Sequence, residues 1–201
     1  MVKYILILII SYLLGSINTS IIVGRIKSGE DIRQFGSGNA GATNTLRTFG
    51  KTAAVLVVVG DVLKAVISIL VAKLISGEDI AVYIASIGVI FGHNFPVFFE
   101  FKGGKGIVVS ATASLFADWR VGLVIIIIAL LIMIITKYVS LGSIIGACLI
   151  VVFGLVFRGI DVEFLVFSII VGGLAIIMHR KNIVRLIKGT ENKLNFSKGD
   201  K

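Results

Sequence analysis

The sequence has 201 residues, of which 57% are hydrophobic and only 15% are charged, and its mean hydropathy is +1.05. This composition excludes a disordered chain, a coiled coil and a nucleic-acid-binding module. It predicts a single integral membrane domain over residues 1–201. The 20 Lys and Arg against 11 Asp and Glu give a net charge of +9, which fits attraction to anionic lipid headgroups or an anionic substrate.

Apolar runs predict an all-α, polytopic bundle of about seven transmembrane helices, some of them short or re-entrant. In chain order the runs cover 4–24, 52–72, 80–99, 107–117, 121–136, 138–157 and 164–178. The run at 107–117 is too short for a relaxed span, so we expect a tilted, short or re-entrant helix there. Lys3 and the run after it look like a signal peptide, but no Ala-x-Ala site follows, and we expect this run to remain as the first span.

Lys and Arg are unevenly divided between the loops, and this predicts the orientation of the bundle. One side carries only Lys3, Lys73, Arg120 and Arg158. The other side carries Arg25, Lys27, Arg33, Arg47, Lys51, Lys102, Lys105, Lys137, Arg180, Lys181, Arg185, Lys188, Lys193, Lys198 and Lys201. We therefore expect the N-terminus outside and the C-terminus in the cytoplasm.

Two charged residues, Asp61 and Lys64, interrupt the second apolar run. They are three residues apart and share a helix face, so they predict an ion pair inside the membrane. Charges in a span are functional candidates, but a self-paired structural bridge explains them as well. The sequence leaves both interpretations open. We expect the single cysteine, Cys148, to be a small core residue.

The first of three polar segments, 36–47, reads GSGNAGATNTLR. Its Gly-x-Gly-x-x-Gly spacing matches the dinucleotide-binding fingerprint, but that motif needs a βαβ unit, and both neighbours here are apolar spans. Closely spaced glycines nevertheless let backbone N–H groups approach an oxyanion, and Arg47 offers a two-pronged contact to phosphate. We expect an anion site, against the alternative of a flexible polar connector.

The second polar segment, 92–106, reads GHNFPVFFEFKGGKG and contains Pro96, the only proline. Proline lacks an N–H, so we expect the third span to kink or end there, with His93 and Asn94 available to pair the freed carbonyls. The glycine turn between Lys102 and Lys105 precedes a short helix, an arrangement that suits an anion. The alternative is a basic turn that contacts lipid phosphate.

The third polar segment, 179–191, reads HRKNIVRLIKGTE. Its apolar residues recur at helical spacing between cations, so residues 178–191 predict an amphipathic cytoplasmic extension of the last span. His179 and Asn182 share one face of that helix. Taken alone, the segment is typical of a membrane-surface anchor. We expect 192–201 to be a polar tail.

Together the three segments resemble the acyl-phosphate:glycerol-3-phosphate acyltransferases of bacteria, the PlsY family. The resemblance implies transfer of a fatty acyl group from acyl phosphate to the 1-hydroxyl of sn-glycerol 3-phosphate, the first acylation step of phospholipid biosynthesis. The products would be lysophosphatidic acid and phosphate. The resemblance also implies a multi-pass protein of the bacterial inner membrane with a site that faces the cytoplasm. Because acyl phosphate is already activated, we expect direct transfer with no acyl-enzyme and no cofactor.

The resemblance also implies which residues form the site. Those implied for catalysis and glycerol 3-phosphate are Ser37, Arg47, Lys105, His179 and Asn182. Those implied for other substrate contacts are Gly38, Asn39, Ala42, Thr43, Asn44, Gly103, Gly104 and Ser143. Either His179 or the phosphate of the substrate could accept the hydroxyl proton, and the sequence does not choose between them.

The competing function is an organic-phosphate transporter or channel, which would need polar groups along a full path across the membrane. Only Asp61 and Lys64 lie deep in a span, and this asymmetry favours an enzyme. The expected partners are glycerol 3-phosphate, acyl phosphate and membrane lipid, with no nucleic acid, and we expect a monomer. Two histidines and one cysteine, without HExxH or CxxC, predict no metal site.

Overall fold

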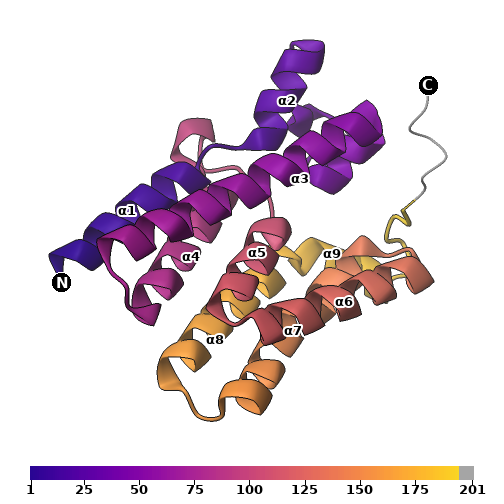
Figure 1. The fold of residues 1–201 in the computed structure, drawn as a ribbon. Helices are drawn as coiled ribbons and strands as arrows, with labels where there is room; N and C mark the ends of the chain where they lie inside the picture. Colours follow the sequence, from indigo (N-terminus) through magenta and orange to yellow (C-terminus); the bar gives the residue numbers. More distant parts are fainter. Residues whose placement is uncertain (195–201) are drawn as a thin grey trace. The chain divides into compact units, whose positions relative to one another are not determined.

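The computed structural model describes residues 1–194, which form α-helices and short 3-10 turns and no strand. The helices are α1 (Val2–Gly15), α2 (Thr19–Ser28), α3 (Ala42–Ile75), α4 (Asp79–Asn94), α5 (Ile107–Ala117), α6 (Trp119–Thr136), α7 (Val139–Arg158), α8 (Val162–Met178) and α9 (Arg180–Ile187) (Figure 1). They belong to two compact units: residues 1–109 form unit 1, and residues 110–194 form unit 2.

In unit 1, helices α1, α3 and α4 pack against one another (Figure 1). Helices α1 and α4 approach each other closely, since a Cβ on Gly92 would overlap the backbone of Tyr12 and Ser16. Only glycine fits there, as is common where membrane helices pack closely. The first apolar run is broken between α1 and α2, and Asn18 caps α2 by accepting a hydrogen bond from the N–H of Ile21 (3.2 Å).

Helix α3 begins ten residues before the apolar run predicted at 52–72, because its first two turns belong to the polar segment 36–47. Gly50 interrupts the helix with φ 82° and ψ −176°, a conformation that favours glycine. Residues 42–49 are therefore a separate short helix that carries Arg47. The apolar length of α3 follows this break.

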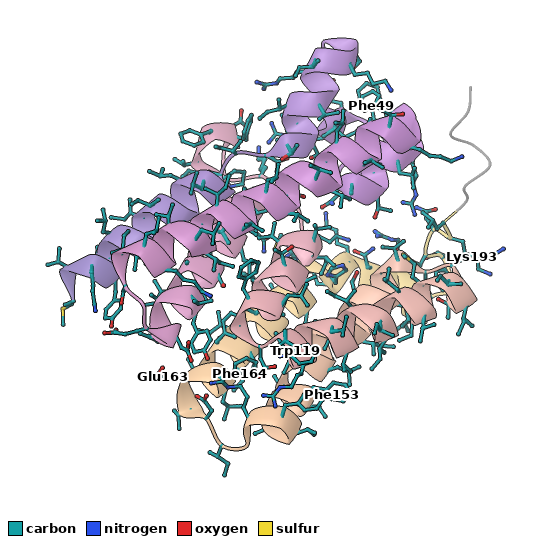
Figure 2. All side chains as sticks on the ribbon, in the orientation of Figure 1. Phe49, Trp119, Phe153, Glu163, Phe164 and Lys193 are labelled. Atoms are coloured by element: carbon teal, nitrogen blue, oxygen red, sulfur yellow. The ribbon has the colours of Figure 1, made fainter. Side chains whose placement is uncertain are left out.

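In unit 2, helix α7 packs against both α6 and α8. A network of charges joins their ends: Asp118 pairs with Arg120 (2.7 Å), and Arg158 pairs with Asp161 (2.6 Å) and lies 3.8 Å from Asp118. Figure 2 shows Trp119 and Phe164 at this end of the unit, and the Arg158 guanidinium lies over the Phe164 ring at 5.2 Å.

The described residues confirm an all-helical chain with membrane-spanning character. Five helical stretches are long and apolar enough to cross a membrane, or six if α8 and α9, which meet at a bend of 59°, count as one span. Helix α5 is short, as expected. The prediction for Cys148 was wrong, because its side chain is exposed on the apolar helix α7 rather than buried in the core. Residues 195–201 of the predicted polar tail lie outside the described part.

The orientation predicted from Lys and Arg can be tested by cysteine labelling in a Cys148→Ser background. Gly77 and Ile160 lie in the loops between α3 and α4 and between α7 and α8; Gly77 has open space around its Cα, and Ile160 is 85% exposed. Gly77→Cys and Ile160→Cys should react with a membrane-impermeant maleimide in intact cells, whereas Lys198→Cys should react only after permeabilisation. The reverse pattern would invert the orientation.

Candidate functional site

The side chain of Asn44 holds the first polar segment in its folded form. It is 1% exposed, and its Oδ1 accepts a hydrogen bond from the N–H of Ser37 (2.9 Å). Its Nδ2 donates to the carbonyls of Ile32 (3.2 Å) and Phe35 (2.9 Å). Asn44 thus shapes the loop in this structure, and its predicted contact with substrate stays a prediction.

Glycines and a helix start give this segment its exposed backbone. Gly36 and Gly38 have φ values of 57° and 71°, and Gly41 precedes the first residue of α3. The N–H groups of Ala42 and Thr43 belong to the first turn of the helix, where backbone donors have no carbonyl partner within the helix. Such a helix start attracts an anion. The remaining members lie alongside: Ser37, Gly38 and Arg47 are exposed, and Asn39 is half-buried.

Arg33 connects this first segment to the second. Its Nη1 donates to the carbonyls of Phe99 (2.9 Å) and Lys102 (3.0 Å), residues 66 and 69 positions away in the sequence. Its Nη2 pairs with Asp31 at 2.7 Å. Burial alone would raise the pKa of Asp31, but the hydrogen bonds from Arg33 outweigh it and hold the pKa below its usual range. This ion pair therefore stays charged at neutral pH and fixes the connection between the two segments.

The second segment turns back on the end of α4. Helix α4 ends at Asn94, two residues before Pro96, which confirms the predicted end of the third span. Two of the carbonyls freed there accept from the glycine turn rather than from the side chains of His93 and Asn94: the N–H of Gly103 donates to Asn94 (3.1 Å) and that of Gly104 to His93 (3.1 Å). This fold places Lys105 two residues before α5.

The first two segments come together beside His93. A Cβ on Gly104 would overlap both Nε2 of His93 and the carbonyl oxygen of Ala40, so the turn, the α4 side chain and the first segment meet at this point. Unit 1 thus contains ten of the predicted site residues: Ser37, Gly38, Asn39, Ala42, Thr43, Asn44, Arg47, Gly103, Gly104 and Lys105.

Unit 2 contains the other three, Ser143, His179 and Asn182. His179 is 2% exposed and follows α8, and its Nδ1 lies 2.8 Å from the carbonyl of Ala175. A carbonyl can only accept, so Nδ1 carries the hydrogen, and in a neutral ring Nε2 is then the nitrogen that accepts. The hydroxyl of Ser143 donates to the carbonyl of Val139 (2.9 Å) in the first turn of α7.

Asn182 is oriented by Glu191, a residue with no role predicted from the sequence. The Glu191 carboxylate accepts from Nδ2 of Asn182 (2.7 Å), from the Ser140 hydroxyl (2.9 Å) and from Arg185 Nε (2.7 Å). Burial raises the pKa of Glu191, but these hydrogen bonds outweigh that effect and bring it below its usual value. One carboxylate thus fastens α9 to the start of α7.

Signals for these missed residues are visible in the sequence. Glu191 is the only carboxylate between His179 and Leu194, among five Lys and Arg, so an ion pair there was foreseeable. Arg33 stands two residues after Asp31, which foretells their pairing but not the contact with the distant loop. Among residues 1–194, no group of three or more His, Cys, Asp or Glu side chains could hold a metal ion.

Comparison with known proteins shows to which family this chain is similar. The family model for glycerol-3-phosphate acyltransferase matches residues 5–189. The chain is 46% identical over 186 residues to the glycerol-3-phosphate acyltransferase of Thermoanaerobacter sp. (strain X514), covering 92% of this chain and 93% of the relative. It is 41% identical over 201 residues to that of Clostridioides difficile (strain 630), covering 98% of each.

Two solved structures are similar over nearly the whole chain. Both are of PlsY (YgiH), an integral membrane glycerol 3-phosphate acyltransferase. The glycerol 3-phosphate form matches with a TM-score of 0.88 at 37% identity, covering 96% of each chain. The lysophosphatidic acid form matches with a TM-score of 0.85 at 35% identity, covering 97% of each. The chain therefore belongs to the glycerol-3-phosphate acyltransferase family of integral membrane proteins.

Proposed function

We propose that this protein transfers a fatty acyl group from acyl phosphate to the 1-hydroxyl of sn-glycerol 3-phosphate, at the cytoplasmic face of the bacterial inner membrane. The observation that carries the proposal is the meeting of two glycine-rich segments beside His93, with Arg47 on one and Lys105 on the other. Both proposed substrates carry phosphate. Backbone N–H groups at helix starts, supplemented by cations, suit that group.

The reaction needs positioning more than a strong catalyst, because acyl phosphate is a mixed anhydride. The hydroxyl oxygen attacks the acyl carbon, a C–O bond forms to glycerol 3-phosphate, and the C–O bond to phosphate breaks. The leaving phosphate takes the bonding electrons and, overall, the hydroxyl proton. Arg47, Lys105 and the backbone N–H groups of Ala42 and Thr43 would stabilise the charge that develops on the leaving phosphate.

His179 and Asn182 supply the polar groups of unit 2 in this proposal. Because Nδ1 of His179 is committed to the carbonyl of Ala175, its Nε2 is suited to accept a hydrogen bond from the attacking hydroxyl. The proton can then pass to Nε2 or directly to a substrate phosphate. Asn182, fixed by Glu191, would orient the acceptor, and Ser37 and Ser143 would add hydroxyl donors.

The transporter alternative depends on the deep charges, and the structure gives those charges other partners. Nζ of Lys64 lies 2.9 Å from Asp61 Oδ1 and donates to the carbonyls of Gly15 and Ile17. These contacts commit both charges to holding helices. They therefore favour an enzyme with its site at one face over a polar path through the membrane.

The acyl donor should be selected by its phosphate and only weakly by its chain. A phosphate site recognises a defined headgroup, whereas an apolar cleft discriminates one methylene by only about 1–3 kcal/mol. Purified protein with labelled glycerol 3-phosphate should therefore form lysophosphatidic acid from palmitoyl phosphate and from neighbouring chain lengths, but not from palmitoyl-CoA. Equal rates with both donor classes would contradict the proposed donor.

Arg47 and Lys105 should act on one bound phosphate. Arg47→Ala and Lys105→Ala should each cost about 2–5 kcal/mol, because each leaves a desolvated phosphate charge without its partner. This corresponds to a loss of roughly 30- to several thousand-fold in kcat/KM. Arg47→Lys should restore activity only in part, since an ammonium lacks the planar fork.

The double variant of Arg47 and Lys105 tests whether they share that phosphate. It should lose less than the sum of the two single losses. Additive losses, together with an unchanged KM for glycerol 3-phosphate in each single variant, would show that the two residues serve separate sites.

Glu191→Gln should destabilise unit 2 at neutral pH, because it removes the charge that pairs with Arg185. Since the folded-state pKa of Glu191 lies below its ordinary value, the stability it contributes is present above about pH 4.5 and is lost as pH falls through the folded pKa. Thermal unfolding in detergent should show a clear deficit at pH 7 that shrinks towards about pH 4. Glu163→Gln, at an exposed position in the first turn of α8, is the control; an equal deficit in both variants would contradict the prediction.

A further inference from the structure

A cluster of ionisable side chains is buried in unit 1, and the proposed reaction does not use it. Asp61 and Lys64 on α3 and His93 on α4 are 3%, 6% and 3% exposed. Lys64 Nζ lies 2.9 Å from Asp61 Oδ1 and 2.8 Å from His93 Nδ1, and the Asp61 and His93 atoms are 3.5 Å apart. The cluster therefore holds these two helices together through charge-assisted contacts.

The same lysine also holds the break between α1 and α2. Its Nζ donates to the carbonyl of Gly15 (3.3 Å), the last residue of α1, and to that of Ile17 (3.1 Å) in the break. These carbonyls lie where the helix is interrupted, and a backbone carbonyl that loses its helical partner within a span needs another donor. Lys64 thus links the break to His93.

The lysine also determines which nitrogen of His93 carries the hydrogen. An ammonium group can only donate, so Nδ1 of His93 accepts, and the neutral ring has its hydrogen on Nε2. The Nε2 edge occupies the space where a Cβ on Gly104 would lie, next to the Ala40 carbonyl. The Nδ1 edge of the ring is thus held by the Lys64 ammonium group, and the Nε2 edge lies against the turn that precedes Lys105.

We propose that His93 is a positioning residue for the phosphate site. Asp61 and Lys64 fix the ring, and the ring sets the place of the Gly104 turn, and with it Lys105, relative to the segment around Ala40. The proposal rests on the proposed function, in which Lys105 binds phosphate. His93 acts through the turn and makes no contact with substrate itself.

Two amide substitutions test the roles of the two edges of the His93 ring separately. His93→Asn puts an amide where Nδ1 stands, so Lys64 keeps an acceptor, but the edge against Gly104 is lost. His93→Gln reaches the Nε2 position and loses the acceptor for Lys64. If the ring positions the turn, His93→Asn should raise the KM for glycerol 3-phosphate about tenfold and leave kcat within about threefold of the wild-type value. Phosphate binding then weakens equally in the ground state and in the transition state. His93→Gln should keep a KM near the wild-type value and have a lower melting temperature than His93→Asn.

Hydrogen exchange gives a readout that does not depend on any reaction. The amides of Gly103 and Gly104 donate to carbonyls at the end of α4. In His93→Asn these amides should exchange about tenfold faster, because the local stability of the turn falls by about the contribution of one hydrogen bond. Ser86→Ala, a buried change on the same helix, should leave exchange and KM unchanged.

The outcomes distinguish this inference from the proposed function. Faster exchange in His93→Asn, in a protein that does not acylate glycerol 3-phosphate, would support positioning and reject the reaction. Unchanged exchange at Gly103 and Gly104 would overturn the positioning role, whatever the activity. A lower kcat at unchanged KM in both variants would also overturn it, because a purely structural role only reduces the fraction of active protein.

Discussion

The contacts of one buried ammonium group hold the first half of this protein together. Lys64 donates to two carbonyls at the break between α1 and α2, pairs with Asp61 and binds His93 of α4. Backbone carbonyls without partners are costly inside a membrane, so a helix can break there only where the protein supplies a donor. Lys64 is that donor. Because of it, α1, α3 and α4 share one fixed point, and the break between α1 and α2 is stabilised.

The polar segments are held in shape by hydrogen bonds to their own backbone groups. The side chains of Asn44 and Arg33 donate hydrogen bonds to carbonyls of the loops. The N–H groups of Gly103 and Gly104 hold the glycine turn against the end of α4. In the proposed function, these loops would offer a phosphate mainly backbone N–H groups, together with the charges of Arg47 and Lys105.

The sequence predicted the helices well because their signal is local. Apolar runs, the single proline and the spacing of Asp61 and Lys64 are all visible within about 20 residues, and the structure confirms helices at each run, the end of α4 and the ion pair. The break between α1 and α2 was missed, because the donor that makes it possible, Lys64, lies 47 to 49 residues away. The same holds for Arg33 and its partners at Phe99 and Lys102. Glycine motifs showed where the polar segments lie, but not that His93 would stand between two of them.

Glu191 fastens the polar end of unit 2 although it lies outside the helices. Its carboxylate accepts hydrogen bonds from Asn182 and Arg185 on α9 and from Ser140 on α7. This link depends on a polar residue that follows the apolar helices in the chain, whereas the capacity of those helices to span a membrane depends on their own apolar runs. The spans of unit 2 and the fastening of α9 are therefore determined by different parts of the sequence.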